Sequence, residues 1–260
     1  MPTVHEIERA LFQWAPKDLA QSWDNVGLLV GEPEQEVRRV LVALDVTEAV
    51  AREAAEKDCQ LIAAHHPVMN CAWSPVQSIR SDTLQGKLLM DLVRSNVAAI
   101  CMHTNLDAAQ GGVNDVLAAR LGLERVEKLG DEEGIGRMGT LPASLSDRAF
   151  LTLVRDRLKP NGLRFSGGGR SVQRVAVGGG ACGDMFPLAV EKGCDAFVTA
   201  DVKYNQFLDA AAMGLLLVDA GHFPTEDPVC PAIAAYLRDR FPELTVIESD
   251  SHREIVQYYV

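Results

Sequence analysis

Short apolar runs rich in β-branched residues alternate along the chain with amphipathic segments of helical length. This alternation predicts parallel β-α-β units, in which each helix connects two neighbouring strands of one sheet. In the first half the pattern predicts strands over Val37–Val46, Gln60–Ala64 and Val97–Met102, and helices over Thr47–Lys57, Thr83–Arg94 and Gly112–Leu121. Thr47 stands where a helix N-cap is expected. The pattern therefore predicts an α/β protein with mostly parallel sheets.

The same order of elements returns in the second half of the chain. It predicts strands over Val172–Val177, Ala196–Thr199 and Leu215–Asp219, and helices over Asp184–Lys192 and Tyr204–Met213. The stretch from 125 to 160 is less regular, and residues 227–260 are expected to add a helix and one or two strands. A chain of this length and this repeated pattern favours two lobes over one large unit.

A sequence repeat supports an internal duplication. The block Arg39–Val42 returns as Arg174–Val177, and the block Glu56–Cys59 returns as Glu191–Cys194. In both copies the cysteine comes 20 positions after the arginine. Two blocks at equal spacing are harder to obtain by chance than one, so we expect the two halves to share a topology.

His65 and His66 close the second predicted strand, and Pro67 ends it. Once the backbone turns, both imidazoles can converge on one side, where neutral imidazole is a common ligand of zinc, iron and related ions. For this pair alone, an ordinary polar strand end is the favoured reading. The pair therefore needs support from other strand ends.

That support comes from the third predicted strand of each half. His103 and His222 follow these strands, and each is followed four residues later by a carboxylate, Asp107 or Glu226. Ligands of open α/β sheets bind at the carboxyl ends of the strands. Two ions about 3.5–4 Å apart need a bridging oxygen donor, which Glu226 or Asp107 could supply. The predicted ligands of a dinuclear site are His65, His66, Asp107, His222 and Glu226.

These five side chains supply too few donors to saturate two ions, so positions stay open for water or substrate, which favours catalysis. His103 is a catalytic candidate, either orienting Asp107 or shuttling protons, with a buried polar strand end as the equal alternative. Asp45, at the end of the first strand, is a weaker catalytic candidate. Asp24 and Asn25 are expected to cap or turn their segment.

The glycines Gly178–Gly180 lie between a strand and a helix, where their amides could cradle a phosphate. Close packing of strand against helix explains them equally well. His5 and His252 have no partner recognisable from sequence and are expected on the surface. The repeat register places Asp201 opposite His66.

Charge and cysteine content narrow the partners and the compartment. The 36 acidic residues outnumber the 25 basic ones and give a net charge of -11, which opposes binding to a phosphate backbone. Nucleic acid is therefore not an expected partner. The six cysteines form no C-x-x-C pair and are expected to be reduced and mostly buried. With no signal-like or membrane-spanning apolar run, the cytoplasm is the expected location and no membrane partner is expected.

Taken together, these motifs resemble those of the NIF-three-like dinuclear-metal family, whose members are also called type-2 GTP cyclohydrolase I homologues. The resemblance covers nearly the whole chain. Its marks are Trp23-Asp24-Asn25-Val26-Gly27-Leu28, His65-His66-Pro67, His103-Thr104-Asn105-Leu106-Asp107, Asp201-Val202-Lys203-Tyr204, and His222 with Glu226. The family's motif usually has histidine after Lys203-Tyr204, where this chain has Asn205, so a ligand or proton-donor role at that position is in doubt.

The resemblance implies two interlinked α/β/α lobes and a toroidal homohexamer. The first lobe would take residues 1–126 and about 228–260, the second about 127–227, with the metal site in the cleft between them. Two divalent ions per chain are implied, zinc, iron or manganese. His66, Asp107 and Glu226 would hold one ion, and His65, His222 and Glu226 the other.

Two classes of function stay open. The resemblance implies a metal-dependent hydrolase of GTP cyclohydrolase type, and a hydrolase of nucleotides or other phosphoesters would use the same metal chemistry. A nucleotide or phosphorylated small molecule would then be the ligand. The alternative is a non-enzymatic metal-binding scaffold or regulatory partner, because no clear nucleophile or general base appears beyond the metal ligands. The sequence therefore leaves open whether the protein is an enzyme.

Overall fold

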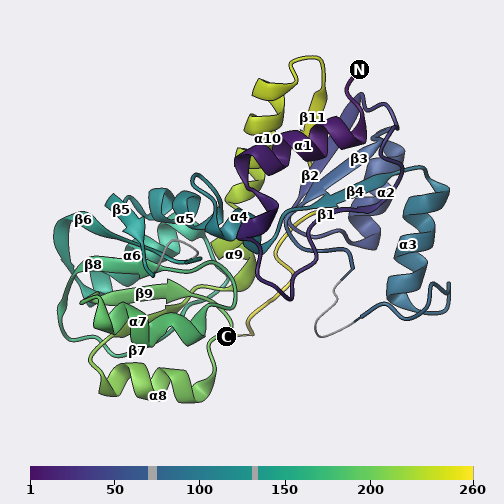
Figure 1. The fold of residues 1–260 in the computed structure, drawn as a ribbon. Coiled ribbons are helices and arrows are strands. Elements are labelled where there is room, and N and C mark those ends of the chain that lie inside the picture. Colours follow the sequence, from purple (N-terminus) through teal and green to yellow (C-terminus); the bar gives the residue numbers. More distant parts are fainter. Residues whose placement is uncertain (70–74, 131–133, 260) are drawn as a thin grey trace. The chain divides into compact units, whose positions relative to one another are not determined.

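The structure is a computed structural model that describes residues 1–69, 75–130 and 134–259. Contacts divide the chain into two units, each made of two separate segments of the chain. Unit 1 comprises Met1–Gln110 and Val229–Arg253, and unit 2 comprises Gly111–Pro228 and Glu254–Val260. Each unit has its own sheet with helices packed on it (Figure 1). The predicted α/β class with two lobes is confirmed.

The sheet of unit 1 has the strand order β1-β4-β3-β2-β11. All neighbouring strands are parallel except β1, which pairs antiparallel with β4. The strands are β1 Gly27–Val30, β2 Arg39–Ala43, β3 Leu61–Ala64, β4 Ala98–Cys101 and β11 Thr245–Glu248. Every residue of β3 and β4 is buried, as expected for central strands covered on both faces. The three strands predicted in this half are confirmed.

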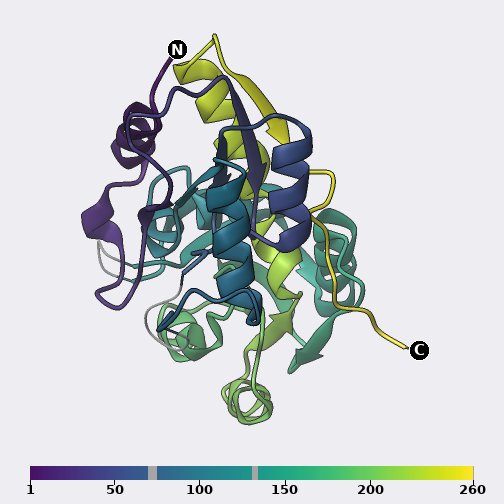
Figure 2. The same cartoon turned by 90° about the vertical axis from the view of Figure 1, so that its right-hand side faces the viewer.

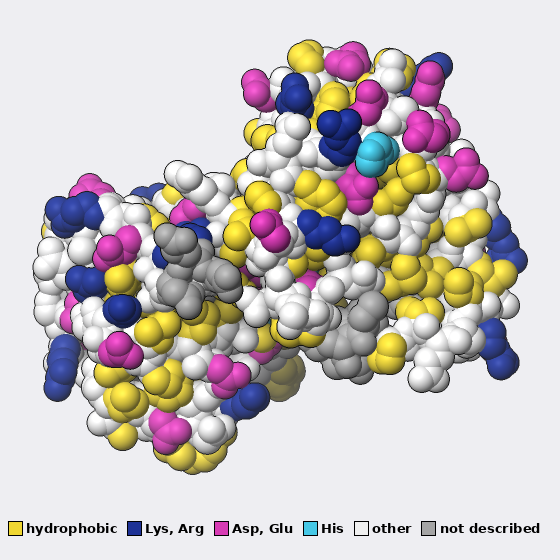
Figure 3. Space-filling view, viewed as in Figure 1, with side chains coloured by type: hydrophobic (Ala, Val, Ile, Leu, Met, Phe, Trp, Pro, Cys, Tyr) yellow, Lys and Arg dark blue, Asp and Glu magenta, His cyan; other side chains and the backbone are white. Residues whose placement is uncertain are grey.

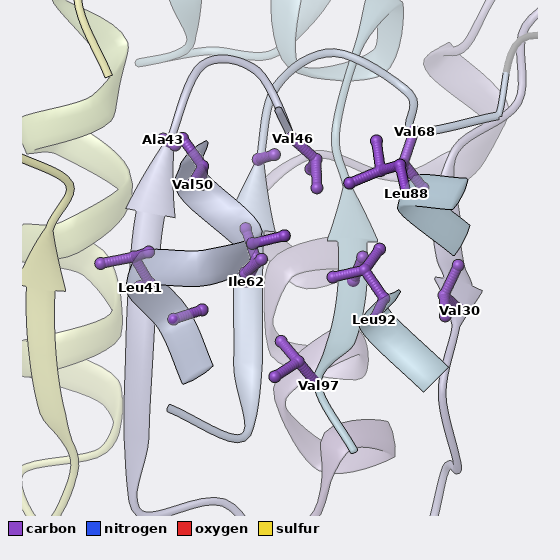
Figure 4. Close-up of a cluster of buried hydrophobic side chains, with 14 of the residues drawn as sticks. Val30, Leu41, Ala43, Val46, Val50, Ile62, Val68, Leu88, Leu92 and Val97 are labelled. Atoms are coloured by element: carbon purple, nitrogen blue, oxygen red, sulfur yellow. The ribbon is translucent and has the colours of Figure 1, made fainter. Parts of the chain in front are cut away.

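Helices cover both faces of this sheet. The helices α2 (Glu48–Glu56) and α3 (Leu84–Arg94) lie side by side on one face, in front of the strands in Figure 2. Both begin at a threonine N-cap, Thr47 or Thr83, whose side chain accepts a backbone amide of the first turn. Figure 4 shows the apolar core that these helices form with the strands.

The other helices of unit 1 lie elsewhere around the sheet. They are α1 (Val4–Trp14), α4 (Thr104–Ala108) and α10 (Val229–Arg240), with a short 3-10 turn at Lys17–Leu19. The helix α10 packs on β11 and β2. Trp14 and Tyr236 stack with ring centroids 4.9 Å apart, which joins α1 to α10. Together these contacts bring the beginning of the chain onto the segment that returns to unit 1.

The sheet of unit 2 has the order β5-β6-β8-β9-β10-β7. Its centre, β8-β9-β10, is parallel, whereas β5, β6 and β7 add antiparallel edges. The strands are β5 Glu124–Lys128, β6 Arg137–Ser146, β7 Arg164–Ser166, β8 Ser171–Val177, β9 Ala196–Thr199 and β10 Leu216–Asp219. The parallel centre is the part that the sequence pattern predicts, and the strand predicted at 196–199 has those bounds.

Helices cover both faces of this sheet as well. One apolar cluster joins α5 and α6 to the strands, and a second joins α7 and α8 to the opposite side chains of the same strands. The helices are α5 Val113–Leu121, α6 Asp147–Leu158, α7 Phe186–Glu191, α8 Tyr204–Ala212 and α9 His222–Glu226, with a 3-10 turn at Gly183–Met185. Unit 2 is thus an α/β/α sandwich.

The two sheets share one topology, in keeping with duplication. In each, three parallel strands follow one another in chain order, as β2-β3-β4 and as β8-β9-β10, and the third has an antiparallel neighbour, β1 or β7. A five-residue helix follows the third strand in both units, α4 in one and α9 in the other. In each unit the histidine that the spacing singled out lies at the beginning of this helix, and the carboxylate lies on it.

The contacts assign some segments to a different unit from the lobe boundaries expected in the sequence analysis. Residues 111–126 belong to unit 2, because α5 packs against α6 and β6. Residues 254–260 also belong there, where Asn161 Nδ2 donates to Val256 O at 2.5 Å. The stretch from 125 to 160, expected to be less regular, contains β6 and α6.

Further expectations concern the cysteines, the charge and the membrane. The described cysteines, Cys59, Cys101, Cys182, Cys194 and Cys230, form no disulfide with one another, and all but Cys182 are buried; Cys71 lies outside the described residues. On the face drawn in Figure 3, basic side chains stand among acidic ones rather than in one basic patch. Among the described residues, every helix is too short or too polar to cross a membrane.

Candidate metal centre

His65 and His66 lie directly after β3, where the chain turns. The amides of both residues donate to Leu44 O, at 3.2 and 2.8 Å. His65 is completely buried, and its Nδ1 donates to Met102 O at 2.7 Å. The Nδ1 of His66 donates to Asp45 Oδ1 at 2.8 Å. The two rings lie with centroids 4.9 Å apart, so the turn brings both imidazoles together as predicted.

His103 is the N-cap of α4 and is held by a buried aspartate. Its Nδ1 lies 2.9 Å from Asp24 Oδ1. The other oxygen of Asp24 accepts the amide of Thr104 at 3.0 Å and its hydroxyl at 2.5 Å. Burial alone would raise the pKa of Asp24, but these bonds and the charge of His103 lower it to about 2. Asp24 therefore orients His103 and accepts the first amide of α4, a segment other than the one that it was expected to cap or turn.

The three imidazoles of unit 1 form one cluster. His103 lies with its ring centroid 5.2 Å from that of His65 and 5.6 Å from that of His66. One ring nitrogen from each histidine lies within 4.8 Å of the others. Asp107, one helical turn after His103, places its Oδ1 3.5 Å from His65 Nε2. Unit 1 thus gathers three nitrogen donors and one carboxylate that could hold a metal ion.

Unit 2 carries its own pair of donors on α9. His222 Nε2 lies 3.0 Å from Glu226 Oε2, and His222 Nδ1 lies 2.6 Å from Asp201 Oδ2. Asp201, at the end of β9, has a positive φ of 51°. Burial would lower the pKa of His222, but hydrogen bonds to Asp201 and Glu226 raise it to about 11. Without metal, this imidazole therefore carries a proton at neutral pH.

The glycines Gly178–Gly180 bring the backbone close to this pair. A Cβ on Gly180 would collide with Glu226 Oε1 and lie 3.1 Å from His222 Nε2. The amide of Gly179 donates to Asn114 Oδ1 at 2.7 Å, and that of Gly180 donates to Thr225 Oγ1 at 3.0 Å. Close packing therefore explains the glycines, and these two amides are committed to protein acceptors rather than to a phosphate.

Asp219, the last residue of β10, fixes the loops around His222. Its carboxylate is buried and accepts the amide of Val202 at 3.0 Å and that of Gly221 at 3.1 Å. Arg164 of β7 pairs with the same carboxylate. The loop that carries Asp201 and the loop that carries His222 are thus tied to one side chain.

Comparison with known proteins decides the family. A family model described as Duf34/NIF3 (NGG1p interacting factor 3) matches residues 2–254. The chain belongs to this family.

Two relatives of this Duf34/NIF3 protein match it over most of their length. A protein of Clostridium perfringens is 33% identical over 243 residues, covering 91% of this chain and 92% of its own, and one of Streptomyces coelicolor is 36% identical over 248 residues, covering 91% and 86%. Both are named GTP cyclohydrolase 1 type 2 homolog.

Solved structures of the family have the same fold. A Bacillus cereus protein related to NIF3 superposes with a TM-score of 0.93 at 25% identity, covering 100% of this chain and 99% of its own. Reduced HcgD from Methanocaldococcus jannaschii gives a TM-score of 0.83 at 27% identity, covering 96% and 98%. The resemblance inferred from the motifs is confirmed.

The remaining candidates divide between buried and exposed positions. His252 was expected on the surface, which is wrong, because its side chain is 7% exposed and its Nε2 accepts the amide of Leu44 at 3.3 Å. It also lies 3.8 Å from Asp45 Oδ2. Asp45 therefore contacts both His66 and His252. Burial alone would raise the pKa of the Asp45 carboxyl, but the hydrogen bonds to these two histidines lower it. His5 and Asn205 are exposed, as the surface assignment of His5 predicted.

Sequence reasoning missed the partners of these histidines more than the histidines themselves. The bonds from Asp24 to His103 and from Asp201 to His222 were not predicted. A signal for Asp201 was present in the repeat register, which placed it opposite His66. No local pattern marks Asp24, which lies 79 positions from His103 in the chain.

Proposed function

We propose that this Duf34/NIF3 protein is a dinuclear divalent-metal protein that acts as a metal-dependent hydrolase. The proposed ligands are His65, His66, Asp107, His222 and Glu226. One observation carries the proposal. In both units a short helix follows the third parallel strand, with a histidine at its beginning and a buried carboxylate four residues later.

The donor chemistry fits divalent ions. The imidazole nitrogens and carboxylate oxygens suit zinc, iron and manganese. The Nδ1 atoms of His65 and His66 are engaged by Met102 O and by Asp45. A histidine that donates through Nδ1 presents the lone pair of Nε2 to a metal, the arrangement common among protein metal sites. In unit 2, Gly180 leaves the space beside Glu226 and His222 that a Cβ would fill.

Neither half alone has enough donors for two ions, so we propose that the two half-sites share them. Glu226 would be the bridging carboxylate, because two close cations require an oxygen donor between them. Asp107 would complete the ion on the side of unit 1. The shared arrangement leaves open positions, which a substrate requires.

Divalent ions at such a site supply Lewis-acid chemistry by acidifying water and polarising the bond under attack. The residues of the chain hold the donors in place. Asp45 fixes the ring of His66, and Asp201 fixes that of His222. Hydrogen bonds to Asp201 and Glu226 raise the pKa of His222, so a cation held by this ring would take the place of its proton.

The names of the relatives favour GTP ring opening as the reaction. A hydrolase of nucleotides or other phosphoesters is the enzymatic alternative, although the amides of Gly179 and Gly180 are engaged by Asn114 and Thr225. We further propose a homohexamer, of about 170 kDa for chains of 28.2 kDa, and a cytoplasmic location. Light scattering coupled to gel filtration tests the assembly.

The test is turnover by protein loaded with manganese, iron or zinc, measured with GTP, other nucleotides and a generic phosphodiester. The hydrolase proposal predicts metal-dependent turnover that Glu226→Gln abolishes. The matched control is Glu191→Gln, at an exposed position of the same unit, which should keep both metal and turnover. A chain that binds two ions and turns over none of these compounds would be a metal-binding scaffold instead, and the hydrolase proposal would fail.

A further inference from the structure

His103 stands outside the five proposed ligands, yet it lies in the same cluster as two of them. One nitrogen each from His65, His66 and His103 lie within 4.8 Å of one another, and all three residues belong to unit 1. The side chain of His103 is only 14% exposed. Three imidazole nitrogens gathered this closely offer a set of neutral donors that suits a divalent cation.

All three rings are oriented in the same way. Each engages an oxygen through Nδ1: His65 contacts Met102 O at 2.7 Å, His66 contacts Asp45 at 2.8 Å, and His103 contacts Asp24 at 2.9 Å. A carboxylate or carbonyl on the far nitrogen is the usual support of a metal-bound histidine, since it sets the tautomer and makes Nε2 more basic. His103 therefore has the same support as the two proposed ligands beside it.

The spacing suits a single ion. With metal–nitrogen bonds of about 2.1 Å, two ligands of a tetrahedral ion lie about 3.4 Å apart. The nitrogens of the cluster are within 4.8 Å of one another, so a shift of about 1 Å by each ring closes the site. Asp107 Oδ1, 3.5 Å from His65 Nε2, adds an oxygen donor from the same unit.

We propose that His103 is a further metal ligand beside the proposed ligands of unit 1, so that the donors of unit 1 keep one divalent cation even when those of unit 2 are removed. This inference rests on the proposed metal site. It also gives the duplicated histidines related roles, because His103 and His222 both follow the third strand of their units and each is paired with an aspartate.

The test uses a full-length chain in which the donors of unit 2 are removed, His222→Ala with Glu226→Ala. Metal-free protein is titrated with Co²⁺, and bound metal is measured together with the visible absorption of the ion, which reports its ligands. We expect one ion per chain. Adding His103→Ala should weaken binding at least about 100-fold and change the spectrum, whereas His5→Ala, an exposed histidine of the same unit, should change neither.

A second variant guards against misfolding, because His103 also occupies the N-cap position of α4. Asp24→Asn keeps the shape of the aspartate but weakens its hold on His103, so we expect Co²⁺ affinity to fall about 10- to 100-fold with an altered spectrum. Unchanged affinity and spectrum in a folded His103→Ala chain would overturn the inference and leave His103 outside the ligand set. If the unaltered protein bound no ion, the proposed metal site itself would fail, which is a distinguishable result.

Discussion

Gly180→Ala tests whether the glycine loop exists to make room for the metal ligands. Gly180 has a positive φ of 63°, and a Cβ there would collide with Glu226 Oε1. The backbone strain alone should lower the free energy of unfolding by about 1–2 kcal/mol. The collision should also push Glu226 away from His222, which lies 3.0 Å from it, and weaken metal binding about 10- to 100-fold.

Gly193→Ala is the matched control. Gly193 belongs to the same unit and has a similar φ of 71°, but a Cβ there meets nothing within 4 Å. It should show the same loss of stability with unchanged metal affinity. Urea unfolding of the metal-free proteins measures the strain, and titration with Co²⁺ measures the affinity. Equal metal affinities for the two variants would refute the explanation of the loop.

Three further substitutions probe the framework. Burial alone would raise the pKa of Glu53, but hydrogen bonds from Lys57 and from the segment after β11 lower it from 4.5 to about 2. The Glu53 carboxylate therefore contributes about 3 kcal/mol to the free energy of unfolding above pH 4.5, and this contribution is lost as the pH falls towards 2. Glu53→Gln should therefore reduce stability at pH 7 and make little difference near pH 2 in urea unfolding. Asp219→Asn should cost about 1–3 kcal/mol and weaken Co²⁺ binding, because it holds the loop of His222; unchanged binding would contradict that role. Thr47→Ala should cost about 1 kcal/mol through loss of the N-cap, measured by thermal unfolding.

The parallel centre of each sheet could be predicted from sequence because its strands are buried on both faces and read as continuous apolar runs. The strand Ala196–Thr199 is an example. The cap Thr47 could also be predicted, because threonine there precedes a segment of helical pattern. The antiparallel edges could not. All but one residue of β5 are exposed, so it has no apolar run to mark it. The pairing of β6 with β8 is irregular between Thr140 and Leu145, which breaks the alternation.

The candidate site, too, could be predicted only in part. The spacing of His222 and Glu226 could be read from sequence, because one helical turn separates them. The aspartates that orient the rings could not, because Asp24 and Asp45 come from other segments and meet the histidines only through the sheet topology. The burial of His252 was missed for the same reason, since its partner Leu44 lies 208 positions away.

The most direct test of the dinuclear account is metal analysis of the reconstituted protein beside Glu226→Ala. After loading with manganese, iron or zinc and removal of excess metal, the account predicts two ions per chain. It predicts a clear loss in Glu226→Ala, which lacks the proposed bridging carboxylate. Fewer than one ion per chain in the unaltered protein, or equal content in the two proteins, would contradict it.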